Sequence, residues 1–126
     1  MFTTQRKLDA TPPFDFQQSL KFLGLFSPTA DEQRANHQVL TKALRHDGQT
    51  VAFQVQNAGS PDQPALQCTV YALEALDTAA QAVIFQRVGL FLSLDDDLLP
   101  FYALAENDPP FASVVQALYG YHQVRF

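Results

Sequence analysis

Three adjacent carboxylates, Asp95, Asp96 and Asp97, form the densest group of potential metal ligands in the sequence. Hard cations such as Ca²⁺ bind carboxylate oxygens, so a cation site is one interpretation of this group. However, no glycine turn or distal glutamate follows at the spacing of a calcium-binding loop. The sequence favours the other interpretation, a charged junction before a helix, where carboxylates stabilise the partial positive charge of the helix N-terminus.

The histidines and the single cysteine do not form a recognisable ligand set. His37, His46 and His122 share no metal-ligand spacing with one another or with Cys68. We therefore predict that the histidines are solvated or locally hydrogen-bonded. Cys68 falls on the apolar face of a predicted strand, which favours a small buried hydrophobic side chain over a nucleophile.

Hydroxyl groups are the remaining candidates for chemistry. None of four serines lies in the glycine-flanked turn that exposes a nucleophile: Ser19, Ser60, Ser93 and Ser113. Tyr102, Tyr119 and Tyr121 could stack on bases, but no basic residues alternate with them, so we predict packing or interface roles. The chain also contains no phosphate-binding glycine loop. We accordingly predict no catalytic, cofactor-binding or metal-binding residue, and no cofactor.

The elements that position these side chains begin with a predicted antiparallel sheet. Gln49–Asn57 alternates apolar and amide residues with a period of two, which is typical of a strand with one buried face. It follows a predicted strand over His37–Arg45, and Asp47 and Gly48 between the two strands predict a hairpin turn. Ala65–Tyr71 is expected to form the next strand, and Phe2–Leu8 an edge strand.

Helical periodicity and capping residues predict four helices. Asp15, with Gln18 in a capping-box spacing, begins a helix over Phe16–Leu25, and Asp77 caps the second helix. A third, short helix is predicted over Leu98–Ala105. The fourth begins after Asp108, with Pro109 at its first position. We expect the fourth helix to bury a stripe formed by Phe111, Val114, Val115 and Leu118.

These elements occur in the order β-α-β-β-β-α-α-α, with Thr29–Ala35 predicted as a loop. The predicted fold class is α+β, with an antiparallel sheet covered on one face by helices. A chain of 126 residues with 47% apolar residues is long enough to be a single domain with its own core. The net charge of −5 makes it a poor stand-alone nucleic-acid binder.

Compartment follows from what the sequence lacks. One cysteine cannot form an intramolecular disulfide, which fits a reducing cytoplasm. No apolar run approaches membrane-spanning length, and residues 1–7 lack the hydrophobic core of a signal peptide. We expect a cytoplasmic protein that does not associate with membranes.

Two stretches resemble a known family. Pro12–Leu23 opens with PPFDF before a Leu/Phe helix, and Phe91–Phe111 contains FLSLDDDLLPFYALAENDP. With the following Leu118–Gly120 and His122–Phe126, they resemble the N-terminal region of bacterial 3-methyladenine DNA glycosylase II proteins, alkylation-repair enzymes of the helix-hairpin-helix superfamily. The resemblance implies a small α+β domain of the TATA-binding-protein type, spanning residues 1–126. It also implies a parent enzyme that flips an alkylated base out of the duplex and cleaves its glycosidic bond.

The resemblance places the family's catalytic aspartate, its DNA-gripping glycine-rich hairpin and its aromatic base pocket beyond a segment of this kind. We therefore expect an excised domain or a truncated relative that is inactive alone, and assign no catalytic role to Asp95, Asp96 or Asp97. The helical segment 94–120 is expected to lead towards the missing catalytic domain. The implied partners are that domain and, through the parent protein alone, damaged duplex DNA.

Two other functions are compatible with the residues. The chain could be an independent interaction or dimerisation module, with a homodimer formed through its C-terminal segment. That segment carries more apolar side chains than one helix face needs, and we expect part of this set to be exposed as a contiguous patch. The set is Val114, Val115, Leu118, Tyr119, Tyr121, Val124 and Phe126. It could also be a small-ligand-binding domain whose phenylalanines line a pocket.

Overall fold

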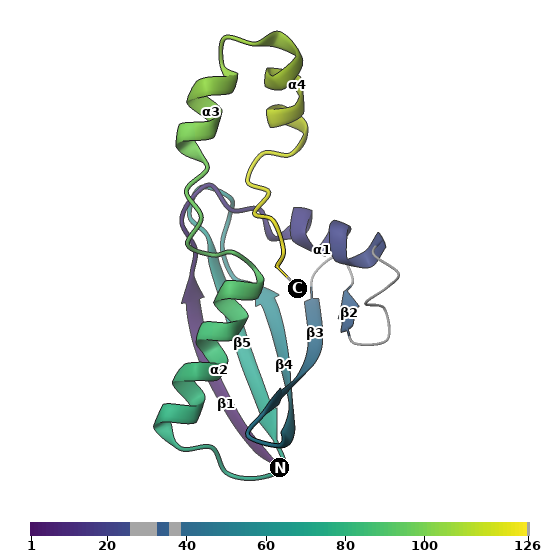
Figure 1. The fold of residues 1–126 in the computed structure, drawn as a ribbon, viewed down its shortest axis with the longest axis vertical. Helices are drawn as coiled ribbons and strands as arrows, with labels where there is room; N and C mark the ends of the chain where they lie inside the picture. The colour runs from purple at the N-terminus through teal and green to yellow at the C-terminus, as the bar shows by residue number, and fades with distance from the viewer. Residues whose placement is uncertain (26–32, 36–38, 126) are drawn as a thin grey trace.

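The structure is a computed structural model that describes residues 1–25, 33–35 and 39–125. The strands are β1 (Phe2–Asp9), β2 (Gln33–Ala35), β3 (Val39–His46), β4 (Gln49–Asn57) and β5 (Ala65–Ala72). The helices are α1 (Phe16–Leu25), α2 (Thr78–Phe91), α3 (Leu99–Ala105) and α4 (Pro109–Ala117). Figure 1 shows α2 lying across one face of the sheet, and α3 and α4 projecting beyond the end of the sheet.

The five strands form one antiparallel sheet in the order β1-β5-β4-β3-β2. β1 lies at an edge, as its polar sequence predicts. The turn between β3 and β4 contains two residues with positive φ, Asp47 at 49° and Gly48 at 79°. Both values match the two-residue hairpin turn whose twist suits antiparallel strands, which confirms the turn predicted from Asp-Gly.

The alternation of β4 places its apolar residues in the core. Val51, Phe53 and Val55 are buried, and Phe53 lies opposite Val70 of β5. Gln54 lies on the other face of the sheet, in the same row as Thr69, whose hydroxyl accepts a hydrogen bond from the Gln5 amide. The register predicted for this strand is therefore confirmed.

α2 covers the apolar face of the sheet through Ile84, Phe85 and Val88, which are all buried. Its N-cap is Asp77, whose Oδ1 accepts a hydrogen bond of 2.7 Å from the Ala80 amide. Arg6 of β1 places its guanidinium 4.5 Å from the centre of the Phe85 ring, a cation–π contact that fastens the edge strand to the helix. The cap predicted for this helix is confirmed.

α1 begins where the sequence predicts, but one detail of its cap differs. Asp15 Oδ1 accepts a hydrogen bond of 3.0 Å from the Gln17 amide. Gln18 does not complete a capping box, because its side-chain amide instead donates to the Ala117 carbonyl at 3.1 Å. The Gln18 side chain, which the sequence predicts to cap α1, therefore joins α1 to the end of α4.

One strand was not predicted. Gln33–Ala35 forms β2 and pairs with β3, although this stretch was assigned to the Thr29–Ala35 loop. Three residues are too few to show a period of two, so pairing at the sheet edge decides their conformation. The predictions for residues 26–32 and for residues 36–38, including His37, lie outside the described residues. In the part of the chain that is described, no helix is both long and apolar enough to cross a membrane.

Candidate interaction surface

The segment of residues 94–120, called here the α3–α4 hairpin, makes few contacts with the sheet. α3 and α4 pack against each other beyond the end of the sheet, as Figure 1 shows. Among the described residues of these two helices, only Ala105 of α3 is buried, and none of α4 is. The hairpin therefore projects from the core and carries apolar residues on its surface.

The buried stripe predicted for α4 is wrong. Phe111, Val114 and Leu118 are 55%, 50% and 44% exposed, and Val115 is half-buried. The apolar periodicity correctly indicated a helix with one apolar face. The period carries no information about what the apolar face contacts. Among the described residues, this face packs against the short helix α3 and lines a pocket together with Tyr121.

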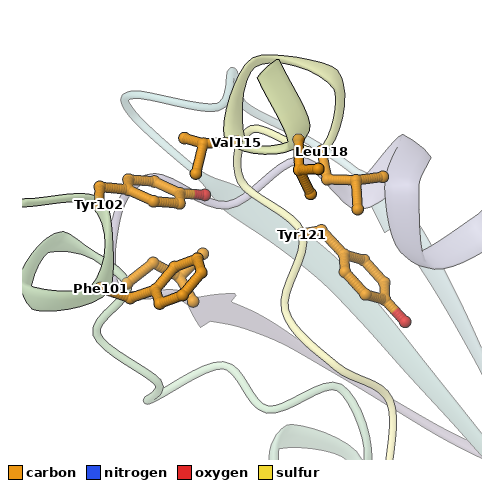
Figure 2. A pocket seen from close by; sticks show the side chains of 7 residues that line it. Phe101, Tyr102, Val115, Leu118 and Tyr121 are labelled. Carbon is orange, nitrogen blue, oxygen red and sulfur yellow. The ribbon is translucent and has the colours of Figure 1, made fainter. Parts of the chain in front are cut away.

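A pocket with a volume of about 220 Å³ lies between the two helices. Its lining residues come from the end of the loop between α2 and α3, from α3 and α4, and from the residues that follow α4. They are Leu98, Phe101, Tyr102, Val114, Val115, Leu118 and Tyr121. Figure 2 shows Phe101 and Tyr102 on one side of the pocket, with Leu118 and Tyr121 on the other. The lining is almost entirely apolar, so the pocket suits apolar side chains rather than an ionic ligand.

Two stacked tyrosines, Tyr102 in the lining and Tyr119 next to it, stabilise this pocket. The rings of Tyr102 and Tyr119 stack with centroids 5.8 Å apart, and the Tyr102 hydroxyl accepts a hydrogen bond of 2.9 Å from the Gly120 amide. Tyr119 donates its hydroxyl to Asp62 Oδ1 at 2.8 Å, and this hydrogen bond raises the pKa of Tyr119 above its usual value. Packing, one of the roles predicted for the tyrosines, is thereby confirmed for these two.

Gly120 joins the hairpin to the start of α1. Its φ of +79° favours glycine, and a Cβ at this position would lie 2.7 Å from the Asp15 nitrogen. The Gly120 carbonyl accepts a hydrogen bond of 2.8 Å from the Asp15 amide. A side chain here would therefore separate the end of the hairpin from α1.

His122 closes the base of the hairpin. Its ring is fully buried, with Nδ1 2.6 Å from the Ser93 carbonyl oxygen and Nε2 2.8 Å from the Pro13 carbonyl oxygen. The Phe14 ring meets it edge to face at 4.8 Å. The prediction of a locally hydrogen-bonded histidine is confirmed for His122, which links the chain entering the hairpin to the chain leaving it.

Further contacts hold the segment after the hairpin against the core. Ser93, at a positive φ of 55°, donates its hydroxyl to the Gln123 carbonyl, and the Arg125 amide donates to the Phe91 carbonyl at 2.8 Å. Val124 is buried in the hydrophobic core, so it does not belong to the exposed part of the terminal apolar set. Buried and exposed residues alternate along this segment, so Val124 points into the core while Gln123 and Arg125 are exposed. The number of apolar residues in the segment does not predict which of them are buried. Phe126 lies outside the described residues.

The three adjacent aspartates have different surroundings. Asp96 Oδ1 lies 2.9 Å from the Arg125 guanidinium, and Asp97 Oδ1 accepts a hydrogen bond of 3.1 Å from the Leu99 amide at the start of α3. Asp95 is exposed. Within the described residues, no group of three or more histidine, cysteine, aspartate or glutamate side chains could hold a metal ion. The geometry agrees with a charged helix junction.

The remaining candidate residues are also dispersed. Cys68 is fully buried, and burial raises the pKa of its thiol to about 12, so the thiolate that chemistry requires is disfavoured. His46 Nε2 lies 3.3 Å from an Asp47 carboxylate oxygen in the β3–β4 turn. Ser60 accepts a hydrogen bond from the Gln63 amide at 3.2 Å in the loop between β4 and β5.

The other two serines differ in environment. Ser19 of α1 is fully buried, and its hydroxyl has no hydrogen-bond partner within the described residues. Ser113 is exposed on α4. No contact among the described residues joins Ser19 or Ser113 to a histidine or a carboxylate that could activate it.

The residues that the sequence interpretation missed are those that line the pocket from α3. Leu98 and Phe101 were not singled out, although Leu98–Ala105 is apolar on nearly every side. A helix that is apolar all round is typically buried. The apolar composition of α3 could therefore have indicated that this helix packs against neighbours on more than one side.

The fold is similar to that of a solved structure, a 3-methyladenine DNA glycosylase from Archaeoglobus fulgidus. The two agree with a TM-score of 0.69 and a sequence identity of 13%. The match covers 94% of this chain and 38% of that chain, so this chain spans well under half of the glycosylase. No protein-family model matches the sequence. A search of curated proteins also finds no match.

What the two proteins share is the fold. The predicted class is confirmed: α+β, with an antiparallel sheet covered by helices, of the TATA-binding-protein-like type. The phenylalanines proposed as the lining of a small-ligand pocket are mostly core residues, including Phe14, Phe16, Phe53 and Phe85. Phe101 is the phenylalanine that lines the pocket described here.

Proposed function

We propose that this chain is the non-catalytic N-terminal structural domain of a cytoplasmic, bacterial base-excision-repair DNA glycosylase that removes alkylated bases such as 3-methyladenine. The observation that carries the proposal is the fold similarity to a 3-methyladenine DNA glycosylase over 94% of this chain. The PPFDF and FLSLDDDLLPFYALAENDP stretches, which resemble the corresponding family, support the same conclusion.

The positions of the reactive side chains support a non-catalytic role. Asp96 is paired with Arg125, and Asp97 caps α3. Cys68 is held as a buried thiol with a raised pKa, and the two nitrogens of His122 face backbone carbonyls. Each of these groups has a structural task in the described chain, and no cofactor enters the proposal.

The partner in this proposal is the helix-hairpin-helix catalytic domain of the parent protein, which the α3–α4 hairpin would brace. A short helix without a buried residue of its own gains stability by packing against another domain. The net charge of −5 supports bracing over contact with DNA phosphates, so damaged duplex DNA would be bound through the parent protein.

The alternative is a stand-alone interaction or dimerisation module without enzymatic activity. The exposed apolar side chains of α4 favour it, because patches of this kind mark partner surfaces of several classes. A homodimer through the C-terminal part of the chain belongs to this alternative.

Sequencing the gene beyond codon 126 and assaying the longer product tests the proposal. We expect an open frame that encodes a helix-hairpin-helix followed by an aspartate, and a longer protein that releases 3-methyladenine from methylated duplex DNA. Residues 1–126 alone should release no more base than a buffer control. Base release by residues 1–126, or an inactive longer protein, would refute the proposal; a frame that stops at codon 126 would favour the alternative.

A further inference from the structure

The helices of the α3–α4 hairpin are too short to gain much stability from their own hydrogen bonds. α3 has seven residues and α4 has nine, whereas isolated helices shorter than about 12–15 residues are marginal in water. The exposed apolar side chains include Leu104, at 81% exposure, together with Phe111 and Val114. Covering them would remove apolar surface from water, which is the main favourable term in protein association.

The size of the pocket indicates what could enter it. Its volume of about 220 Å³ is below the roughly 300–1,000 Å³ typical of small-molecule sites. Tyr121 closes one side and Phe101 the other, as Figure 2 shows. A pocket of this volume and lining fits one or two apolar side chains that project from a partner polypeptide.

The charges around the pocket restrict the partner further. Residues 94–120 contain no lysine, arginine or histidine and five carboxylates, which are Asp95, Asp96, Asp97, Glu106 and Asp108. The aspartates precede α3, whereas Glu106 and Asp108 follow it, so the negative charges flank a helix about 10 Å long. Asp96 is paired with Arg125, and the other four have no basic partner among the described ion pairs.

We propose that the α3–α4 hairpin docks a helical polypeptide segment whose apolar stripe fills the pocket and whose two flanks carry lysine or arginine. Complementary charge on the flanks favours the correct encounter and excludes partners of like charge. A second copy would place five carboxylates opposite five more, and nucleic acid would bring phosphates to the same carboxylates. Both are therefore disfavoured as occupants.

This inference deepens the proposed function by naming the chemistry of the surface that the hairpin would brace. This inference rests on the proposed function only in one respect, which is the identity of the protein that contains the partner segment. The two can fail separately, because base release by the longer protein tests the repair role and peptide binding tests the hairpin.

The probe is a synthetic amphipathic helix with leucines at i, i+3, i+4 and i+7, one tryptophan on the same face and lysines at both ends. The protein contains no tryptophan, so the fluorescence of the peptide reports binding directly. We expect saturable binding that weakens as salt rises. A matched peptide with glutamates in place of the lysines should not bind.

Variants of the protein locate the binding site. Val115→Asp, in the pocket, should abolish binding, and the milder Leu118→Ala should weaken it even if Val115→Asp unfolds the hairpin. The double variant D95N/E106Q should weaken binding by about twofold to thirtyfold, from the modest value of two exposed charges. Leu73→Ser is the matched control, because Leu73 is an exposed apolar residue outside the hairpin and should leave the affinity unchanged.

Three results would overturn the inference. They are equal binding of the glutamate and lysine peptides, binding of the lysine peptide that survives both pocket variants, and no saturable binding of the lysine peptide. Light scattering and a duplex DNA titration examine the other occupants. A dimer, or DNA binding, that Leu118→Ala disrupts would assign the surface to that occupant and refute the proposed one.

Discussion

Replacing His122 with alanine should destabilise the protein and release the α3–α4 hairpin. The substitution removes both ring nitrogens, which lie 2.6 and 2.8 Å from the Ser93 and Pro13 carbonyl oxygens. The Ser93 carbonyl keeps the Asp96 amide as a donor at 3.2 Å, so the Pro13 carbonyl is the acceptor that the substitution leaves without a described partner. A buried acceptor left unsatisfied costs about 1–3 kcal/mol. The Phe14 ring also loses the contact with the imidazole edge. We expect a total loss of about 2–4 kcal/mol, a large share of the roughly 5–15 kcal/mol typical of a folded domain.

Urea denaturation gives the loss of stability, and hydrogen exchange shows where it appears. Amides of α3 and α4 should lose more protection than those of β4, because His122 links the two chain segments at the base of the hairpin. His122→Gln retains side-chain N–H donors and should lose less stability than His122→Ala. Gln123→Ala, at the exposed neighbouring residue, should change stability by less than about 0.5 kcal/mol.

The reasoning fails if His122→Ala and Gln123→Ala lose the same stability. It also fails if His122→Ala lowers protection in β4 as much as in α4, since the ring would then act as a general core residue. Unchanged exchange in α3 and α4 would mean that Gly120 and Arg125 hold the base of the hairpin without His122.

Three further predictions concern the core. Phe53→Ala should lower the free energy of unfolding by about 3–5 kcal/mol, whereas Gln54→Ala should change it by less than about 0.5 kcal/mol; equal losses in chemical denaturation would disprove the register. Ser19→Ala should be neutral or stabilising in the same assay, because it removes a buried hydroxyl without a partner in the described residues, and a clear loss would reveal a hidden hydrogen bond. The Cys68 thiol has a pKa raised to about 12 in the folded protein, against about 8.5 in an unfolded chain. Its stabilising contribution is therefore complete below pH 8.5 and falls by up to about 1.4 kcal/mol per pH unit as the pH rises towards 12. Cys68→Ala should lack this decline, and a matching slope in both proteins would contradict the assignment.

Local sequence signals predicted the elements well where they act within one element. The period of two in Gln49–Asn57 gave both the strand and its buried face, and Asp77 gave the start of α2. Asp47 and Gly48 gave the turn. In each case the deciding interaction lies within a few residues, so the sequence contains it.

The candidate site was harder to predict because its features depend on distant partners. The stripe on α4 indicated a helix but not that its apolar face would remain exposed. Gln18 was assigned to a local cap, yet it binds the Ala117 carbonyl 99 residues away. The two carbonyls facing His122 come from segments 29 and 109 residues distant. Sequence spacing carries no information about such pairs.

The chain leaves the core after Leu94 and rejoins it at His122, whose ring contacts the Ser93 carbonyl. A segment that departs and returns at one place can change length at little thermodynamic cost, because doubling a loop adds only about 0.6 kcal/mol of closure entropy. The hairpin can therefore accumulate insertions and substitutions while the sheet and α2 keep their register. In evolution, this separation would let related proteins diversify their partners on a constant scaffold.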